Sequence, residues 1–150
     1  PALVEQPVAK EDWEGLAKVT RESKTLVCAD ESVSSLEDAK RLIKGKAAGA
    51  INIKFMKTGI GEACAIARLA KKSGLKLMIG TMMETPLAVT AAAHLAAGLG
   101  GFDFIDLDAP FFMAERVTRG NFVTRSGIYD LSKVRSGIGV VPRISDSLCC

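Results

Sequence analysis

Residues 50–57 read Ala-Ile-Asn-Ile-Lys-Phe-Met-Lys. The first part of this stretch is almost entirely apolar, and a lysine closes it. A short, continuous apolar run is typical of a parallel strand that is covered on both faces. Residues 50–55 are therefore predicted to form a buried strand with Lys54 near its carboxyl end.

Four further apolar runs flank this stretch, at residues 2–4, 25–29, 76–79 and 102–107. Helical patterns separate the runs, at residues 11–23, 35–44, 61–73 and 86–97. A capping box opens the second helix, formed either by Ser34 with Glu37 or by Ser35 with Asp38. The fourth helix has Pro86 in its first turn and is predicted to close at Gly98. Strands that alternate with helices predict a parallel sheet with right-handed crossovers.

The polar residues at the strand ends recur at a nearly constant interval. The steps from Glu5 to Asp30, Lys54, Thr81 and Asp106 are 25, 24, 27 and 25 residues. One βα unit of a (β/α) barrel has about that length, because roughly 250 residues make eight units. A dinucleotide-binding sheet also alternates strands and helices, but no G-x-G-x-x-G follows any of these strands. The predicted α/β fold is therefore an incomplete (β/α) barrel with five of its eight strands.

The barrel pattern ends after Pro110. We expect residues 1–110 to form the partial barrel and residues 111–142 to leave it as an irregular, glycine-rich segment. Residues 143–150 are expected to form a loose tail. Pro1 runs directly into a predicted strand, so the natural start is expected to lie upstream.

Composition argues against several classes of function. Of the 150 residues, 48% are hydrophobic and 25% are charged, and the net charge is +3. So small a charge, without a run of basic residues, argues against nucleic-acid binding. No apolar stretch reaches the roughly 20 residues that a membrane span needs. The cysteine spacing predicts free thiols, and this portion shows no targeting signal, so we expect a cytoplasmic or organellar protein.

Charged side chains gather at the predicted strand ends, where barrel enzymes place their active sites. They are Glu5, Asp30, Glu31, Lys54, Lys57, Glu84, Asp106 and Asp108. A single loop charge is usually only solvated, but acids and a lysine share the same register in five successive units. Converging carboxylates bind a hard cation such as Mg²⁺, and a lysine beside them can have a near-neutral pKa and act as a base. Such a set suits removal of a proton next to a carboxylate.

Four motifs carry a resemblance to a known family. In chain order they are Val4-Glu5-Gln6-Pro7, Ala29-Asp30-Glu31-Ser32, Ile51-Asn52-Ile53-Lys54-Phe55-Met56-Lys57 and Asp106-Leu107-Asp108-Ala109-Pro110. Together they resemble the enolase superfamily, its muconate lactonizing enzyme subgroup and, within that subgroup, the dipeptide epimerases. The resemblance runs from about residue 1 to residue 142. It implies strands four to eight, the C-terminal part of a TIM-like (β/α) barrel.

The resemblance implies roles for the residues after the first three strands. Glu5 and Asp30 would bind Mg²⁺, and Lys54 would be the acid/base lysine. Glu31 would be a second acid near that lysine. Lys57 would be a structural or surface lysine.

The resemblance also implies the residues that contact a substrate. Asp106 and Asp108 would hold the α-ammonium group of a dipeptide by charge pairing. Thr81, Met82 and Glu84 would line the pocket. Residues 111–142 would return toward an N-terminal capping domain.

The implied function is a Mg²⁺-dependent epimerase of L-Ala-D/L-amino acid dipeptides with a Glu-like second residue. It would remove the α-proton through a metal-stabilised enediolate. A muconate cycloisomerase, an o-succinylbenzoate synthase or an N-acylamino acid racemase is the alternative within the superfamily. Their substrates lack a free α-ammonium group, so the pair Asp106 and Asp108 argues against them. A non-catalytic truncated fragment is the alternative from another class.

The chain departs from the family pattern at its start. The family carries a Lys-x-Lys on its second strand and a metal-binding Asp on its third, and this chain begins at the fourth. We therefore expect the chain alone to be inactive and to act with an N-terminal barrel half and a capping domain. Unpaired sheet edges also predict a homo-oligomer.

Overall fold

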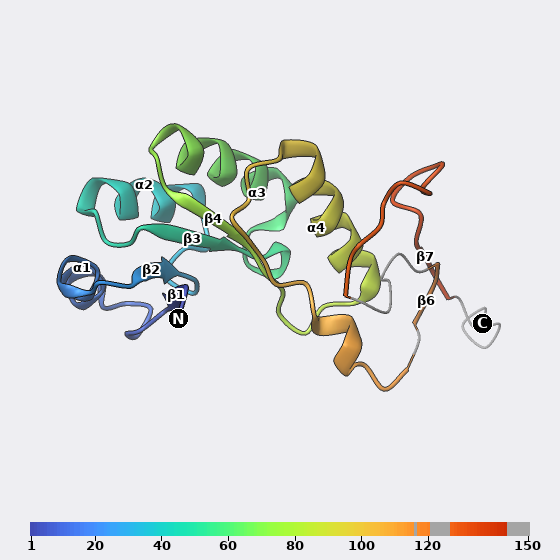
Figure 1. The fold of residues 1–150 in the computed structure, drawn as a ribbon, viewed down its shortest axis with the longest axis horizontal. Helices are drawn as coiled ribbons and strands as arrows, with labels where there is room; N and C mark the ends of the chain where they lie inside the picture. The colour runs from blue at the N-terminus through green and yellow to red at the C-terminus, as the bar shows by residue number, and fades with distance from the viewer. Residues whose placement is uncertain (116, 121–126, 144–150) are drawn as a thin grey trace. The chain divides into compact units, whose positions relative to one another are not determined.

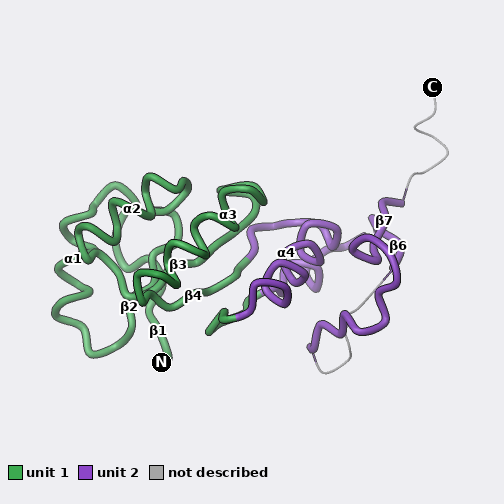
Figure 2. The backbone as a smooth tube through the Cα atoms, turned by 90° about the horizontal axis from the view of Figure 1, so that it is seen from above, with its two compact units in different colours: residues 1–80, 101–106 green, residues 81–100, 107–150 purple. Residues whose placement is uncertain are grey.

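The computed structural model describes residues 1–115, 117–120 and 127–143. Figure 2 shows two compact units: residues 1–80 with 101–106 form unit 1, and residues 81–100 with 107–150 form unit 2. The parallel sheet and the first three described α-helices lie in unit 1, and the fourth lies in unit 2.

Unit 1 is built on a five-stranded parallel sheet (Figure 1). Its strands are β1 (Leu3–Glu5), β2 (Leu26–Ala29), β3 (Ala50–Ile53), β4 (Lys76–Ile79) and β5 (Phe104–Ile105), hydrogen-bonded in that order. Every neighbouring pair is parallel. Consecutive parallel strands that lie side by side are the arrangement of a (β/α) barrel, which confirms the predicted fold class. The last strand is shorter than predicted, since β5 spans only Phe104–Ile105.

The strand register divides the sheet into two faces, because successive side chains of a strand point to opposite sides. One face is apolar and is buried along its three central strands by Val27, Ala29, Ile51, Ile53, Leu77 and Ile79. The other face carries Cys28, Ala50 and Met78, with the partly buried Leu3, Leu26 and Phe104 packed against them. This second face is called the inner face below.

Three helices cover unit 1. They are α1 (Trp13–Glu22), α2 (Leu36–Gly45) and α3 (Phe55–Lys72). α3 contacts β3, β4 and α2, while α1 contacts β2. Leu16, Leu42 and Ile66 are the fully buried side chains that anchor the three helices in turn. Burial of one such side chain contributes about 1.5–3 kcal/mol.

α3 begins at Phe55, whereas the sequence predicted a helix from residue 61. Two helical stretches meet here, because Gly59 has φ 67° and ψ 173°. This backbone conformation is almost restricted to glycine. The stretch after Gly59 is the predicted helix, and the single turn before it carries Lys57.

Unit 2 contains α4 (Pro86–Leu99), the 3-10 helix η1 (Ala109–Phe112), and an antiparallel pair of β6 (Thr118–Arg119) and β7 (Val141–Pro142). α4 starts at its proline as predicted. It ends at Gly100, which has φ 60°, instead of at Gly98. The strand pair was not predicted, because two-residue strands leave no periodic signal in a sequence.

The segment expected at residues 111–142 thus contains part of η1 and both short strands of unit 2. The expected tail lies outside the described residues except for Arg143, whose backbone N–H donates to the Val117 carbonyl at 2.8 Å. In the described part of the chain, no helix combines the length and the apolar character that crossing a membrane requires.

The start of α2 resolves the two predicted capping boxes in favour of Ser35. Ser35 Oγ accepts a hydrogen bond from the Asp38 backbone N–H at 3.2 Å, and donates to Asp38 Oδ2 at 2.7 Å. Asp38 also accepts from the Ser34 backbone N–H at 3.1 Å. Ser35 therefore caps the first turn of α2 by accepting from the free N–H of Asp38.

Ser35→Ala should lower the free energy of unfolding by about 1 kcal/mol, because it removes the acceptor for a first-turn N–H. Urea unfolding of the two proteins measures the difference. Ser136→Ala, at an exposed serine of unit 2, is the control and should stay within about 0.5 kcal/mol of the parent. Equal losses in both variants would contradict the cap.

Candidate active site

The carboxyl ends of β1, β2 and β3 bring three charged side chains together. β1 ends at Glu5, and Asp30 and Lys54 directly follow β2 and β3. Lys54 Nζ lies 2.6 Å from Asp30 Oδ2 and 3.9 Å from Glu5 Oε1. The parallel register explains this meeting, because alternation along each strand places all three side chains on the inner face.

Asp30 is held by two ammonium groups. Its side chain is only 4% exposed. Lys54 donates to Oδ2, and Lys57 donates at 2.5 Å both to Oδ1 and to the Asp30 carbonyl. The Lys57 side chain is 8% exposed, so it is an inward lysine and not a surface one. Each carboxylate oxygen of Asp30 therefore has its own cationic donor.

Glu5 is held by Asn52. Asn52 Nδ2 donates to Glu5 Oε1 at 2.6 Å, and the whole Asn52 residue is buried. Among the described residues, Asn52 Oδ1 has no hydrogen-bond partner. A Cβ placed on Gly80 would lie 2.7 Å from both Nδ2 and Oδ1 of Asn52. The glycine thus leaves the space in which the amide reaches Glu5.

β4 contributes Gly80, not Thr81, to this edge of the sheet. Ile53 pairs with Ile79, and Ile79 pairs with Ile105. One residue further along, Gly80 therefore stands level with Lys54 and Asp106. The sequence spacing had put Thr81 at this strand end, but Thr81 is one residue beyond it and belongs to unit 2.

Gln6 joins the loops that carry the two carboxylates. Its Oε1 accepts from the backbone N–H groups of Asp30 at 2.9 Å and Ser32 at 3.2 Å. Its Nε2 donates to Ser32 Oγ at 2.8 Å. Gln6 has φ 38°, and such a non-glycine conformation costs about 1–3 kcal/mol. These hydrogen bonds offset that cost and fix the loop after β1 against the loop after β2.

The pKa values of the two carboxyl groups move in opposite directions. Burial raises the pKa of Asp30, but the charge of Lys57 and the hydrogen bond from Lys54 outweigh it, so this pKa lies below its usual value. Burial raises the pKa of Glu5, and the hydrogen bond from Asn52 opposes this only in part. The charge of Asp30 adds to the rise. The two carboxylates therefore repel each other.

The two carboxylates control the pKa of Lys54. Burial lowers its pKa, but the hydrogen bond and charge of Asp30, with the charge of Glu5, outweigh burial and raise it above the usual value. The carboxylates thus stabilise the ammonium form. A cation bound to the same carboxylates would offset their charge and bring the pKa of Lys54 down.

An open hollow of about 600 Å³ lies at this edge. It is lined by Glu5, Gln6, Val8, Lys10, Asp30, Glu31 and Lys54. Glu31 is exposed and adds to the negative charge that raises the pKa of Lys54. A ligand in the hollow would therefore meet Lys54 and three carboxylates.

Glu5 and Asp30 suit a hard divalent cation. Their oxygens are the donors that Mg²⁺ prefers, and their mutual repulsion is the kind that a bound cation relieves. No three His, Cys, Asp or Glu side chains are grouped to hold a metal within the part of the chain that the structure describes. Mg²⁺ is commonly bound through one or two carboxylates, with water and substrate oxygens completing its shell. The pair fits that mode of binding.

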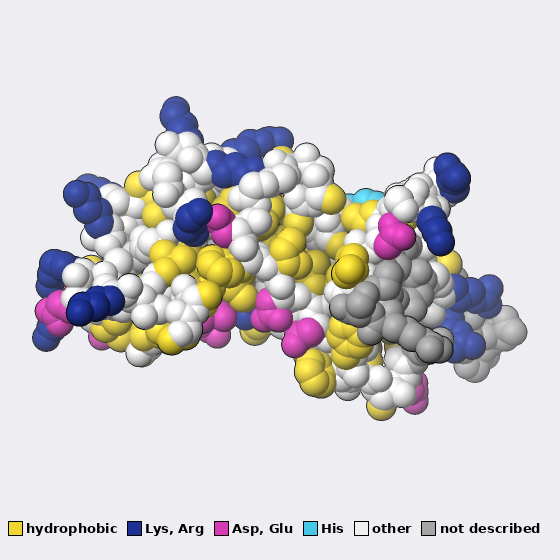
Figure 3. All heavy atoms as spheres, viewed as in Figure 1, with side chains coloured by type: hydrophobic (Ala, Val, Ile, Leu, Met, Phe, Trp, Pro, Cys, Tyr) yellow, Lys and Arg dark blue, Asp and Glu magenta, His cyan; other side chains and the backbone are white. Residues whose placement is uncertain are grey.

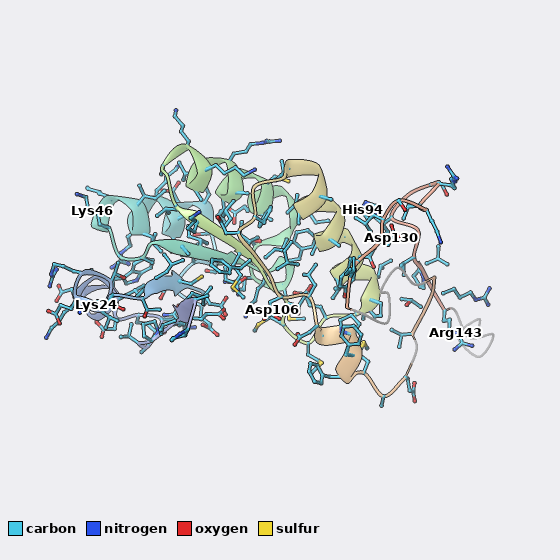
Figure 4. The ribbon with its side chains drawn as sticks, viewed as in Figure 1. Lys24, Lys46, His94, Asp106, Asp130 and Arg143 are labelled. Carbon is cyan, nitrogen blue, oxygen red and sulfur yellow. The ribbon has the colours of Figure 1, made fainter. Side chains whose placement is uncertain are left out.

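The residues expected to contact substrate are divided between the units. Asp106 follows β5 in unit 1 (Figure 4), and its backbone N–H donates to the Ile79 carbonyl at 2.9 Å. Asp108 is in unit 2, where it opens η1. Both are exposed. Thr81, Met82 and Glu84 also lie in unit 2, and there the Met82 N–H donates to the buried Glu84 carboxylate at 3.4 Å.

Tyr129 supports the loop between the two aspartates and was missed in the sequence. Its hydroxyl group donates to the Leu107 carbonyl at 2.5 Å. Burial and the charge of Asp108 raise the pKa of Tyr129 to about 12, so the phenol stays a neutral donor. It is the only tyrosine of the chain, but it lies in an irregular segment where no pattern links it to the site.

The parallel sheet defines an α/β protein of the (β/α)-barrel class, and the charged cluster lies at its carboxyl edge, where proteins of that class place their active sites. The chain belongs to the family described as Enolase C-terminal domain-like, whose family model matches residues 1–147.

Similar proteins agree with this assignment. The chain is 53% identical over 148 residues to the hydrophobic dipeptide epimerase of Citrifermentans bemidjiense, covering 97% of this chain and 40% of that protein. A mandelate racemase/muconate lactonizing enzyme structure from Roseiflexus sp. matches with TM-score 0.91 and 51% identity, covering 95% and 41%. A dipeptide epimerase from Enterococcus faecalis, complexed with Mg and L-Leu-L-Tyr, matches with TM-score 0.85 and 40% identity, covering 93% and 40%.

The chain spans about two fifths of the length of these relatives. Its fold corresponds to the C-terminal part of the enolase-superfamily TIM-like barrel.

Gly80→Ala should lower the free energy of unfolding by about 1–3 kcal/mol, because the new Cβ overlaps the buried Asn52 amide. Urea unfolding measures the loss. Gly98→Ala is the matched control: nothing lies within 4 Å of a Cβ there, and alanine in a helix should stabilise by roughly 0.5–1 kcal/mol. Stabilisation by both substitutions would contradict the role given to Gly80.

Proposed function

We propose that this chain carries part of the active site of a Mg²⁺-dependent dipeptide epimerase, which inverts the α-carbon of the second residue of L-Ala-D/L-amino acid dipeptides. The observation that carries the proposal is the position of Lys54, whose ammonium group faces both Glu5 and Asp30 in the hollow. The relatives named as dipeptide epimerases support the same conclusion.

Lys54 is proposed to move the proton. Epimerisation removes the α-hydrogen from one face of the carbon and returns a proton to the other face. Lys54 serves one face: its amine form accepts the proton, and its ammonium form returns one in the reverse direction. Glu31, near Lys54 in the hollow, adds to the field that sets the balance between these two forms.

Glu5 and Asp30 are proposed to hold Mg²⁺. When bound, Mg²⁺ supplies positive charge for the enediolate-type anion that forms as the α-proton leaves. The same two carboxylates are the groups that raise the pKa of Lys54. Occupying them with a cation therefore also favours the amine form of the lysine, which is the form that a base requires.

Asp106 and Asp108 are proposed to hold the α-ammonium group of the dipeptide. Both are exposed acids on either side of Leu107, whose carbonyl accepts the Tyr129 hydroxyl hydrogen bond. Two carboxylates around one ammonium group give short, charge-assisted hydrogen bonds. Thr81, Met82 and Glu84 are proposed to line the rest of the pocket.

An apolar second residue of the dipeptide is favoured over the Glu-like one that the motifs implied. Exposed apolar side chains lie in the first segment assigned to the substrate and shortly after the second, and they are Met82, Met83, Phe111 and Phe112. Exposed apolar groups of this size at a binding site suit an apolar ligand. The relative from Citrifermentans bemidjiense is named for hydrophobic dipeptides.

The other face of the substrate carbon is proposed to be served by an N-terminal barrel half with a capping domain. The inner face of the sheet supports this, because Leu3, Leu26 and Phe104 on it are only partly buried. Figure 3 shows hydrophobic side chains at the surface of unit 1 between charged ones. Association of the barrel half, or of a second copy in a homo-oligomer, would cover apolar surface and sheet edges.

The full-length protein with Mg²⁺ should incorporate deuterium from D₂O at the α-carbon of the second residue of L-Ala-L-Leu or L-Ala-L-Glu, and more rapidly with leucine. Lys54→Ala should lower kcat by about 10²–10⁴-fold. Removal of Mg²⁺ by a chelator should stop the exchange, and added Mg²⁺ should restore it. Proton NMR of the substrate measures all three results.

Lys44→Ala, at an exposed lysine of α2, is the control and should keep parental activity. Residues 1–150 expressed alone should show no exchange. A full-length protein that exchanges no α-hydrogen with any dipeptide, or a Lys54→Ala variant with parental rates, would overturn the proposal.

A further inference from the structure

Lys57 uses all of its hydrogen-bonding capacity inside the protein. Its ammonium group donates to Asp30 Oδ1 at 2.5 Å, to the Asp30 carbonyl at 2.5 Å and to the Asn52 carbonyl at 2.9 Å. A lysine ammonium has three protons, so these three acceptors take all of them. The side chain does not line the hollow described above, where Lys54 does.

This bonding separates the two lysines by task. The Lys57 ammonium is enclosed by its three acceptors and has no donor left for a ligand. Lys54 makes one short contact, to Asp30 Oδ2, and faces the hollow. Lys54 is therefore the group that can reach a ligand, while Lys57 is directed at Asp30 itself.

The backbone fixes the direction of Lys57. Its N–H donates to the Lys54 carbonyl at 3.0 Å, within the single turn that opens α3. Gly59 ends that turn with φ 67° and ψ 173°. The first turn therefore does not share the direction of the rest of α3. Lys57 in this turn reaches Asp30 at the end of β2 instead of pointing to solvent.

We propose that Lys57 is a positioning residue for Asp30. Lys57 donates to the carbonyl and Oδ1 of Asp30 and to the Asn52 carbonyl, and so fixes the plane of the Asp30 carboxylate. Oδ2 then faces Lys54 and the hollow. The metal-binding consequence rests on the proposed function, in which Asp30 binds Mg²⁺. The orientation of Asp30 does not depend on it.

The charge of Lys57 and its geometry affect Mg²⁺ binding in opposite directions. A positive charge next to a metal ligand weakens the attraction for a cation, whereas a fixed ligand geometry strengthens binding. Lys57→Arg separates the two, because it keeps the charge but cannot place a planar guanidinium on the same three acceptors. If Lys57 acts through its charge alone, Lys57→Arg should leave the Mg²⁺ affinity unchanged. If Lys57 positions Asp30, Lys57→Arg should weaken Mg²⁺ binding.

The test measures Mg²⁺ binding to the full-length protein by isothermal titration calorimetry. Lys57→Arg should raise the Kd for Mg²⁺ by about 10–100-fold, the usual effect of losing a residue that orients a metal ligand. With saturating Mg²⁺, kcat should fall while the KM for the dipeptide stays the same, because Lys57 does not touch the hollow. Lys72→Arg, at an exposed lysine of the same helix, should leave Kd and kcat at parental values.

Crystal structures of the parent and of Lys57→Met give a second readout that needs neither metal nor activity. The Asp30 carboxylate should turn or become disordered in the variant. Parental Kd in Lys57→Arg, or an Asp30 carboxylate that stays within about 0.5 Å of its parental position in Lys57→Met, would overturn the proposal. A parent that binds no Mg²⁺ would instead count against the proposed function, and the orientation of Asp30 would still decide the role of Lys57.

Discussion

The candidate site depends on the contact between one enclosed carboxylate and two ammonium groups. Asp30 lies between Lys54 and Lys57, whose charges and hydrogen bonds outweigh the burial that raises its pKa. Leaving such a charge without its partner costs about 3–5 kcal/mol. Glu5 supplies the second negative charge, so two acids and two lysines balance one another. Balanced charge lets a polar cluster persist at the edge of an apolar sheet.

The sheet creates this cluster through its geometry. The carboxyl ends of parallel strands lie at the same edge of the sheet. Because side chains alternate between the two faces, Glu5, Asp30 and Lys54 all point to the inner face at that edge. β3 has a double part in the cluster, because the Asn52 side chain reaches Glu5 while its carbonyl accepts from Lys57. A change at Gly80, which never touches the carboxylates, is therefore expected to act on them through Asn52.

Much of this was predictable from the sequence, because the responsible features repeat along the chain. The strands, the helices and the meeting of Glu5, Asp30 and Lys54 all follow from a regular interval between strand ends. The errors lie where the interval is locally broken. The break at Gly59 moved the start of α3. Gly80 was missed in the sequence as the strand end after β4, because a glycine has no charged or bulky side chain to mark it.

Other features depend on contacts between distant residues, which a linear pattern does not encode. The inward direction of Lys57 follows from the conformation of one turn, and the support from Tyr129 crosses 22 residues of chain. The raised pKa of Lys54 follows from the sum of several charges around it. Residue types alone suggested a lysine with a near-neutral pKa. The contacts of Lys54 with Asp30 and Glu5 favour its ammonium form, and a cation bound to the same carboxylates would favour the amine form.

A double-mutant cycle between Asp30 and Lys57 tests the central contact most directly. The free energies of unfolding of the parent, Asp30→Asn, Lys57→Met and the double variant are measured in urea with a chelator present, so that metal binding contributes nothing. The double variant should lose about 1–3 kcal/mol less than the sum of the single losses, because each single substitution leaves an unbalanced charge. Losses that add within about 0.5 kcal/mol would show that the two groups do not stabilise each other.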